Sequence, residues 1–280
     1  MRSNIRCIPK FWGIHAEPRG LFGWVLSALP FVVLIGVYWY FSYQRHVENP
    51  VDKALPSLKQ MVDALSNLAL VPDQRTGEYS FLVDTTTSLK RLGWGLSVPA
   101  VLGLVLGINL GLFPGLRKVL LNFFTFFSSF SPMAVMPIIL IVFGVDEFSK
   151  FMLLVIGLTP GIFKGIYLEV INIPIEQKTK ALTLGASQLG MVYRVILPRV
   201  LPNLFELVAG SLGIAWIFLI SAEAISSNAG LGCRIFQARR YMNMDVIIPY
   251  AAWIALLGFI IFQVLMAISR WTCSWYTATK

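Results

Sequence analysis

Four long stretches of this sequence contain no aspartate, glutamate, lysine or arginine, and they limit what the chain can fold into. They cover residues 20–44, 92–116, 119–145 and 246–269. Each is long enough for a helix to cross the hydrocarbon core of a bilayer, which takes about 20 residues. Two further stretches, about residues 148–168 and 201–223, are also apolar; they contain Lys164 and Glu206, and Glu223 ends the second. Because a backbone in lipid must satisfy its own hydrogen bonds, we predict an all-α membrane protein with six transmembrane helices.

Composition and chemistry agree with this fold class. Only 13% of the residues are charged, whereas soluble domains carry about 25%. The net charge of +9 indicates basic loops beside a membrane rather than nucleic-acid binding. The three cysteines form no CxxC and the two histidines have no ligand-spaced partners, so we expect no metal site and no disulfide through Cys233. The sequence has no GxxxxGK[ST] loop, so ATP would have to be hydrolysed by another chain.

The order of apolar and polar segments predicts a topology with both termini in the cytoplasm. Residues 1–20 form a basic cytoplasmic tail, residues 21–43 a first transmembrane helix that is too long for a signal peptide, and residues 271–280 a second tail. Residues 44–91 form an external loop, and residues 92–270 hold the other five helices. Within the loop, apolar residues recur at helical spacing and predict an amphipathic helix, although a surface loop with some helix fits the same pattern: Val51, Leu55, Leu58, Met61, Val62 and Leu65.

Small residues and prolines predict details of the core. The spacing of Gly103, Gly107 and Gly111 is typical of helices that pack closely in a membrane. Pro132 and Pro137 are expected to break the third span, which is tolerated where the backbone is buried in protein or lines a cavity. Either Asp84 or Thr85 is expected to cap the helix that leads into the second span.

The loop 170–200, on the predicted cytoplasmic side, is the strongest candidate for a functional surface. From Ile175 it reads as a short helix, a glycine at Gly185 that permits a sharp turn, and a second helix. Pro198 and Pro202 are expected to end that second helix. Its apolar stripe consists of Leu189, Val192, Tyr193 and Ile196. We therefore predict a hairpin with one side against the membrane bundle and the other facing a soluble protein.

The sequence from Ala181 to Ser187 (ALTLGAS), with Leu197-Pro198 further on, resembles the EAA loop of ABC importer permeases. Other segments resemble one branch of them, the nitrate, sulfonate and bicarbonate (taurine-type) permeases. Residues 87–95 look like its SLxRxxxG segment, 131–137 like its proline- and alanine-containing segment, 143–150 like FGxGExSK, and 221–232 like AE…GLG. The resemblance covers roughly residues 80–270 and implies a type I ABC importer permease fold.

The chain departs from the family pattern at two places. Thr179-Lys180-Ala181 stands where the family has Glu-Ala-Ala, and Glu176, one helical turn earlier, is a possible substitute for the missing carboxylate. Asp146 replaces the second glycine of FGxGE, which alters the turn on the external side. The geometry of a helix, a glycine and a second helix is retained, so docking of an ATPase is still expected.

The resemblance implies a non-catalytic permease subunit of an ATP-driven importer in the bacterial inner membrane. Its partners would be a cytoplasmic ATPase dimer that holds ATP and Mg²⁺, a second permease copy and a periplasmic or lipid-anchored binding protein, with no cofactor on this chain. The solute would be small and anionic, such as nitrate, a sulfonate like taurine, or bicarbonate. Two alternatives stay open, a permease for a neutral thiamine-precursor-like solute and a secondary transporter driven by an ion gradient. A membrane scaffold would leave the hairpin unexplained.

Three groups of candidate residues follow. The ATPase contact is predicted at Thr179, Lys180, Ala181, Thr183, Leu184, Gly185, Ala186, Ser187, Leu189, Val192 and Tyr193. The substrate path is predicted at Ser128, Ser129, Ser131, Met133 and Glu223. Glu223 fits equally as a structural partner of an arginine on the external side, because an ionisable group at a membrane boundary needs a partner. The binding-protein contact is predicted at Arg234, Arg239 and Arg240, which are alternatively solvated charges.

Overall fold

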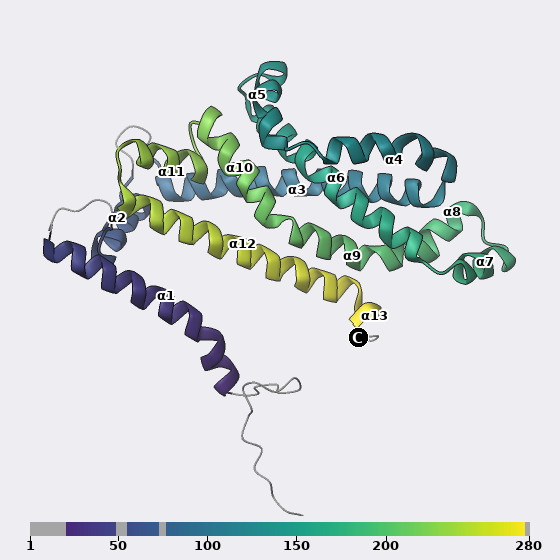
Figure 1. The fold of residues 1–280 in the computed structure, drawn as a ribbon, viewed down its shortest axis with the longest axis horizontal. Coiled ribbons are helices and arrows are strands. Elements are labelled where there is room, and N and C mark those ends of the chain that lie inside the picture. Colours follow the sequence, from purple (N-terminus) through teal and green to yellow (C-terminus); the bar gives the residue numbers. More distant parts are fainter. Residues whose placement is uncertain (1–20, 49–54, 73–76, 278–280) are drawn as a thin grey trace, which may run out of the picture.

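Helices joined by short turns make up the computed structural model, which describes residues 21–48, 55–72 and 77–277 (Figure 1). In chain order they are α1 (Leu21–Glu48), α2 (Leu58–Leu70), α3 (Ser80–Leu112), α4 (Pro114–Ser128), α5 (Pro132–Phe143), α6 (Glu147–Asn172), α7 (Ile175–Thr183), α8 (Gln188–Met191), the π-helical turn η1 (Val192–Ile196), α9 (Leu197–Gly210), α10 (Leu212–Ser226), α11 (Leu231–Arg240), α12 (Met244–Thr272) and α13 (Ser274–Thr277). No strand occurs in these ranges, which confirms the all-α fold class.

The predicted membrane crossings correspond to helices of the structure. Four helices are long and apolar enough to cross a bilayer singly: α1, α3, α6 and α12. Two bent pairs pass the same test, α4 with α5 at 98° and the segment Gln188–Gly210 with α10 at 45°. The described residues therefore supply six crossings when each bent pair counts as one, in agreement with the six apolar stretches.

The break in the third span lies just before its first proline. α4 ends at Ser128, and Pro132 occupies the first turn of α5, where its missing amide removes no helical hydrogen bond. Pro137 lies inside α5 and does not interrupt it. The 98° bend therefore comes from residues 129–131.

The helix after Gly185 does not end at Pro198 or Pro202, contrary to the prediction. It continues to Gly210 because a wide π-turn precedes the first proline. In that turn the amide of Leu197 bonds to a carbonyl five residues back, that of Val192, which makes room for the proline ring. Pro198 follows directly as the second residue of α9, and Pro202 lies inside α9 without ending it.

Close packing of α3 on α6 forms the centre of the bundle. A Cβ atom added at four glycines of α3 would lie 2.5–2.9 Å from a side chain of α6, so the two helices approach more closely than a larger residue allows without a shift. The pairs are Gly95 with Leu154, Gly103 with Ile162, Gly107 with Ile166 and Gly111 with Val170. The predicted packing role of the 103–107–111 series is confirmed.

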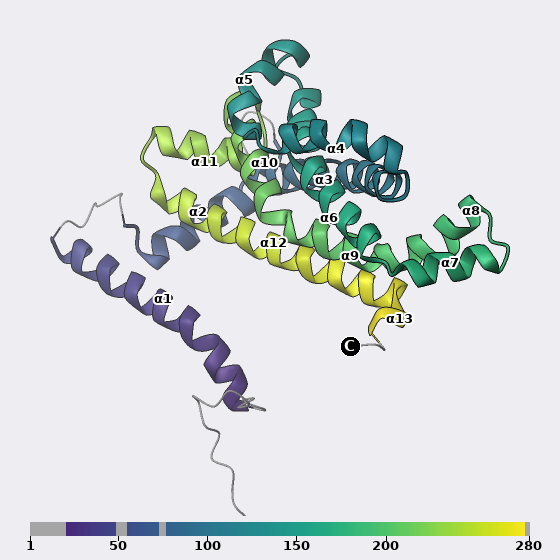
Figure 2. The ribbon, with the colours of Figure 1, turned by 45° about the vertical axis from the view of Figure 1, so that its right-hand side comes forward.

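The molecule is elongated, with distinct structures at its two ends. Figures 1 and 2 show α7 and α8 at one end of the long axis, which we name the hairpin end, and α2 and α11 at the other, the far end. The C-terminal helix α13 lies near the hairpin end. The predicted tail 1–20 and residues 278–280 lie outside the described residues.

The first helix, α1, stands apart from the bundle in both views (Figures 1 and 2). It is joined to the segment before α2 by the Tyr38 hydroxyl, which donates to the carbonyl of Pro56 at 2.7 Å. α2 begins with a capping box at Ser57 and packs on α3 and α12. The predicted amphipathic helix is therefore present from Leu58, whereas Val51 lies outside the described residues.

Candidate functional site

A glycine-centred turn joins α7 to α8 and defines the hairpin of residues 175–197. Gly185 has φ +79°, a left-handed conformation that costs other residues about 1–2 kcal/mol. The amide of Ala186 bonds to the carbonyl of Ala181, and the amide of Gly185 bonds to the carbonyl of Leu182. Together these bonds form the Schellman motif that ends a helix, so the turn is ordered by its own backbone.

Replacing Ser187 with alanine is expected to weaken the start of α8 by about 1 kcal/mol, because its hydroxyl caps the helix. Ser187 accepts the amide of Gly190 at 3.1 Å. Hydrogen–deuterium exchange should therefore speed up at Gly190. Thr179→Ala is the control, since the Thr179 hydroxyl bonds only the carbonyl of Ile175 in its own helix. Equal exchange at Gly190 in the two variants would contradict the capping role.

The tip of the hairpin is exposed. Leu184 is 87% exposed, and neither α7 nor α8 contains a buried residue. Among the predicted ATPase contacts, Thr179, Lys180, Thr183, Leu184, Gly185 and Ser187 are exposed, and Ala181 and Ala186 are half-buried. Leu182 and Leu189, on either side of the turn, are exposed as well, and several exposed apolar side chains close together are typical of a surface that meets another protein.

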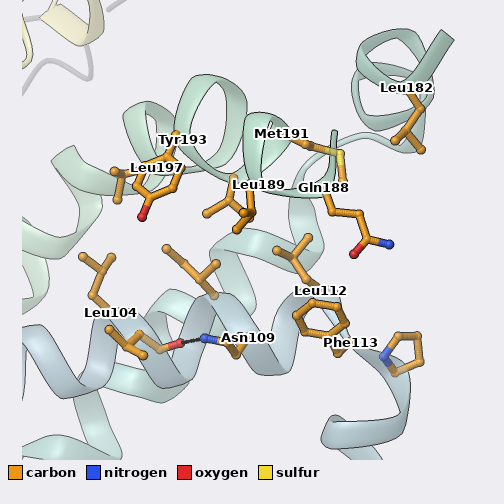
Figure 3. Close-up of a pocket in the computed structure, with 14 residues that line it drawn as sticks. Leu104, Asn109, Leu112, Phe113, Leu182, Gln188, Leu189, Met191, Tyr193 and Leu197 are labelled. Carbon is orange, nitrogen blue, oxygen red and sulfur yellow. Dashed lines mark hydrogen bonds between the residues drawn. The ribbon is translucent and has the colours of Figure 1, made fainter. Parts of the chain in front are cut away.

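An apolar groove of about 810 Å³ separates the second half of the hairpin from the end of α3 (Figure 3). Leu189 and Tyr193 line it and point toward α3, and they are 71% and 66% exposed. Val192 is half-buried and Ile196 is buried. Of the predicted apolar stripe, only Ile196 is thus fully packed on the bundle. Leu189 and Tyr193 face the groove, so their predicted ATPase contact stays a prediction.

Polar bonds hold the base of the hairpin against the bundle. The Lys178 ammonium donates to the carbonyl of Val170 in α6 at 3.0 Å, and the Arg199 guanidinium of α9 donates to the side-chain oxygen of Gln177 at 2.8 Å. Partial burial lowers the pKa of Lys178. Glu176 is exposed and has no ion pair with any described residue. That Glu176 takes the place of the glutamate that the family has at position 179 stays a prediction.

At the far end, charged side chains from α3, α6, α10 and α11 meet in a cluster that is largely buried, with Glu147 exposed at its edge. Glu223 is 1% exposed and accepts hydrogen bonds from the Ser88 hydroxyl at 2.7 Å, the Arg91 guanidinium at 2.7 Å and the Gly232 amide at 2.8 Å. Arg91 also donates twice to Glu147, at 2.6 Å. We name the following set the ion-pair cluster: Asp84, Ser88, Arg91, Glu147, Lys150, Glu223 and Arg234.

Asp84 joins this cluster and does not cap a helix, so the capping prediction is wrong. α3 begins at Ser80, one turn earlier. The Asp84 carboxylate instead accepts the Gly230 amide and the Arg234 guanidinium, each at 2.9 Å. Thr85, the other capping candidate, donates its hydroxyl to a carbonyl within α3. Because Asp84 is 1% exposed, it requires these partners from the α11 side.

The cluster brings together three of the motif segments, 87–95, 143–150 and 221–232. Glu223 is the partner of an arginine, in agreement with one of its two predicted roles, and the arginine is Arg91, the last residue of the predicted external segment 44–91. Arg234, predicted to meet a binding protein, is half-buried against Asp84. Arg239 and Arg240 are exposed, and their contact with a binding protein stays a prediction. Sequence reasoning missed Arg91 and Glu147 as partners, although ionisable residues at the ends of apolar stretches signal that partners exist.

The remaining path candidates lie elsewhere, around the break between α4 and α5. Ser128, Ser129, Ser131 and Met133 are all exposed. The hydroxyls of Ser128 and Ser129 donate back to the carbonyl of Thr125 in their own helix. The Met133 sulfur lies 3.8 Å from the Ser221 hydroxyl of α10. The structure therefore does not assemble these residues and Glu223 into one site. Within the described residues, no three His, Cys, Asp or Glu side chains gather as a metal site would require.

Comparison with known proteins identifies relatives. The profile of a family described as "Binding-protein-dependent transport system inner membrane component" matches residues 100–272. The taurine transport system permease protein TauC of Escherichia coli is 27% identical over 251 residues, 90% of each chain. A putative ABC transporter permease protein of Methanocaldococcus jannaschii is 30% identical, covering 77% of this chain and 79% of that one.

Two further comparisons concern a bicarbonate permease and a solved structure. The bicarbonate transport system permease protein CmpB of Synechococcus elongatus is 28% identical, covering 73% of this chain and 78% of that one. An inward-facing structure of the MetNI methionine ABC transporter matches with a TM-score of 0.62 at 18% identity. It covers 69% of this chain and 95% of that one. The fold is thus that of a type I ABC importer permease.

Proposed function

The chain belongs to the family of inner membrane components of binding-protein-dependent transport systems, and from this membership we propose which surface meets the ATPase and which solutes cross. The protein is an ABC importer permease, a multi-pass membrane subunit that is not itself an enzyme. Such a subunit works with an ATPase and a substrate-binding protein. This membership decides against a secondary transporter driven by an ion gradient.

The 175–197 hairpin is the contact for the ATPase. The observation that carries this is its position: an ordered turn at Gly185 projects from one end of the bundle with Leu184 almost fully exposed. Lys180 and Thr183 are exposed on α7 and extend the same contact. The hairpin end would accordingly lie in the cytoplasm, as would the nearby C-terminus. ATP and Mg²⁺ are held by the ATPase, and this chain holds no cofactor.

The solute is a small anion of the sulfonate, bicarbonate or nitrate class. Support comes from the relatives, whose names specify taurine, aliphatic sulfonates and bicarbonate. All three solute types carry an anionic group. The binding protein delivers the solute at the far end, where Arg239 and Arg240 are exposed and would attract it or meet an acidic face of the binding protein. The neutral, thiamine-precursor-like solute is the second candidate.

Two copies of this chain form the pathway in the bacterial inner membrane. ATP-driven closure of the ATPases draws the two hairpins together, and the cavity between the copies changes from facing the cytoplasm to facing outward. The side chains of this chain bind no nucleotide in this scheme. Its part is to convert the movement of a docked surface into a rearrangement of membrane helices.

Replacing Gly185 with valine is expected to abolish most ATP-dependent uptake while the protein remains in the membrane. A β-branched residue at φ +79° costs about 1–3 kcal/mol, so the hairpin turn is distorted locally. The measurement is uptake of labelled taurine, bicarbonate and nitrate by vesicles that contain the permease, its ATPase and its binding protein. Gly115→Val is the control, because Gly115 has open space around it and an ordinary φ. Uptake that persists in Gly185→Val, or without the ATPase, would contradict the proposal.

A further inference from the structure

We propose that Lys178 and the Gln177–Arg199 pair are positioning residues, which hold the hairpin at a set angle to the membrane helices and transmit its movement to α6 and α9. This inference rests on the proposed function of the hairpin as the ATPase contact. It concerns the base of the hairpin, which is distinct from the exposed tip that would meet the ATPase.

The first link replaces a hydrogen bond that a proline removes. In a continuing helix the carbonyl of Val170 would accept the amide of residue 174, but that residue is Pro174 and has no amide proton. The Lys178 ammonium donates to this carbonyl instead, at 3.0 Å. Val170 is fully buried, so a carbonyl there without a donor would be costly. Lys178 thereby joins the first arm of the hairpin to the last turn of α6.

The second link joins the first arm of the hairpin to the start of α9, just beyond the second arm. Arg199, in the first turn of α9, donates to the side chain of Gln177 at 2.8 Å, a separation of 22 residues along the chain. A second carbonyl nearby also lacks its usual helical donor because of a proline. Pro202 has no amide proton to donate to the carbonyl of Pro198, and the Trp275 indole donates to that carbonyl at 3.2 Å. The start of α9 is thus held by α7 on one side and by the C-terminal helix α13 on the other.

Few other contacts could fix the angle of the hairpin. α7 and α8 contain no buried residue, and the groove of about 810 Å³ keeps Leu189 and Tyr193 away from α3. Apolar packing of the second arm begins with Met191 and Val192, which are half-buried against the core, and is complete at Ile196, near the end of that arm. The first arm, α7, contributes no residue to the core. Apart from the continuous chain, the bonds of Lys178 and Arg199 are therefore the connections through which a movement of α7 reaches α6 and α9.

The test compares Lys178→Met, which keeps the apolar stem and loses the donor, with Lys178→Arg, which keeps a donor. Both are measured as the assembled transporter in vesicles, with ATP hydrolysis and solute uptake recorded together. We expect Lys178→Met to retain the bound ATPase but to take up about tenfold less solute per ATP hydrolysed, the effect of one hydrogen bond to a buried acceptor. Lys178→Arg should restore the ratio. Lys164→Met, an exposed lysine of α6 away from the hairpin, is the control and should leave the ratio unchanged.

Three outcomes would overturn the inference. An unchanged ratio in Lys178→Met would show that the bond transmits nothing. Loss of the ATPase from the purified Lys178→Met complex would place Lys178 in the docking surface instead. Failure of Lys178→Arg to restore the ratio in a folded, assembled complex would exclude the donor role. If the unmodified transporter itself showed no ATP-dependent uptake, the proposed function would fail, and that result is distinguishable from the other three.

Discussion

Replacing Glu223 with alanine is expected to remove most of the folded protein from the membrane. Its carboxylate is 1% exposed and bonds Ser88, Arg91 and the Gly232 amide. Removing one partner of a buried ion pair costs about 3–5 kcal/mol, because the remaining charge has lost its compensation. That cost is a large fraction of the stability of a typical protein, about 5–15 kcal/mol.

The measurement for Glu223→Ala is the yield of monodisperse protein in detergent and its thermal midpoint. Glu176→Ala is the matched control: it makes the same substitution at an exposed carboxylate of α7 and should leave both quantities unchanged. Glu223→Gln, which keeps the shape and one acceptor oxygen, should fall between the two. A midpoint for Glu223→Ala equal to that of the unmodified protein would mean that the ion-pair cluster does not stabilise the bundle.

Replacing Gly107 with valine is the second change with a large expected effect, because it forces α3 away from α6. A Cβ atom at Gly107 would lie 2.6 Å from the Ile166 side chain and 2.9 Å from the carbonyl oxygen of Phe163. Overpacking of this kind costs about 1–3 kcal/mol, and the backbone contact prevents relief by side-chain rotation alone. The expected result is a lower thermal midpoint and a lower yield of folded protein.

Gly93 provides the control for this substitution. It lies in the same helix, and nothing lies within 4 Å of an added Cβ atom there, so Gly93→Val should be well tolerated. Combining Gly107→Val with Ile166→Ala should recover a small part of the lost thermal stability, since it removes the nearest atom, Ile166 Cγ2, but leaves Ile166 Cβ at 2.7 Å and the Phe163 carbonyl oxygen at 2.9 Å. If Gly93→Val and Gly107→Val lowered the thermal midpoint equally, helix propensity rather than helix–helix contact would be the cause of the effect.

Much of the fold could be predicted from the sequence because it depends on local rules. The length of uncharged apolar stretches sets where a helix can cross a bilayer, and the crossings of the described residues follow them. Gly185 marked the hairpin turn because a positive φ is a property of single residues. The exact ends were less predictable: α1 continues to Glu48, and the helix after Gly185 passes Pro198 because a π-turn makes room for the ring.

The candidate sites were predictable only in part. The tip of the hairpin is exposed as expected, because the turn that presents it is formed by neighbouring residues. The path candidates near Ser131 were grouped by residue type, and the structure does not bring Glu223 to them. The role of Lys178 was not predictable, since it depends on the turn between α6 and α7, which brings its ammonium to the carbonyl of Val170.

The sequence by itself determined the crossings, the hairpin turn and the close contact along the glycine series, because each follows from properties of residues a few positions apart. Only the tertiary structure decided the charge partners. Arg91 and Glu223 are 132 residues apart in the chain, and Asp84 and Arg234 are 150 apart. A buried charge requires some partner, but which one it finds depends on how the helices pack, and no local pattern encodes that choice.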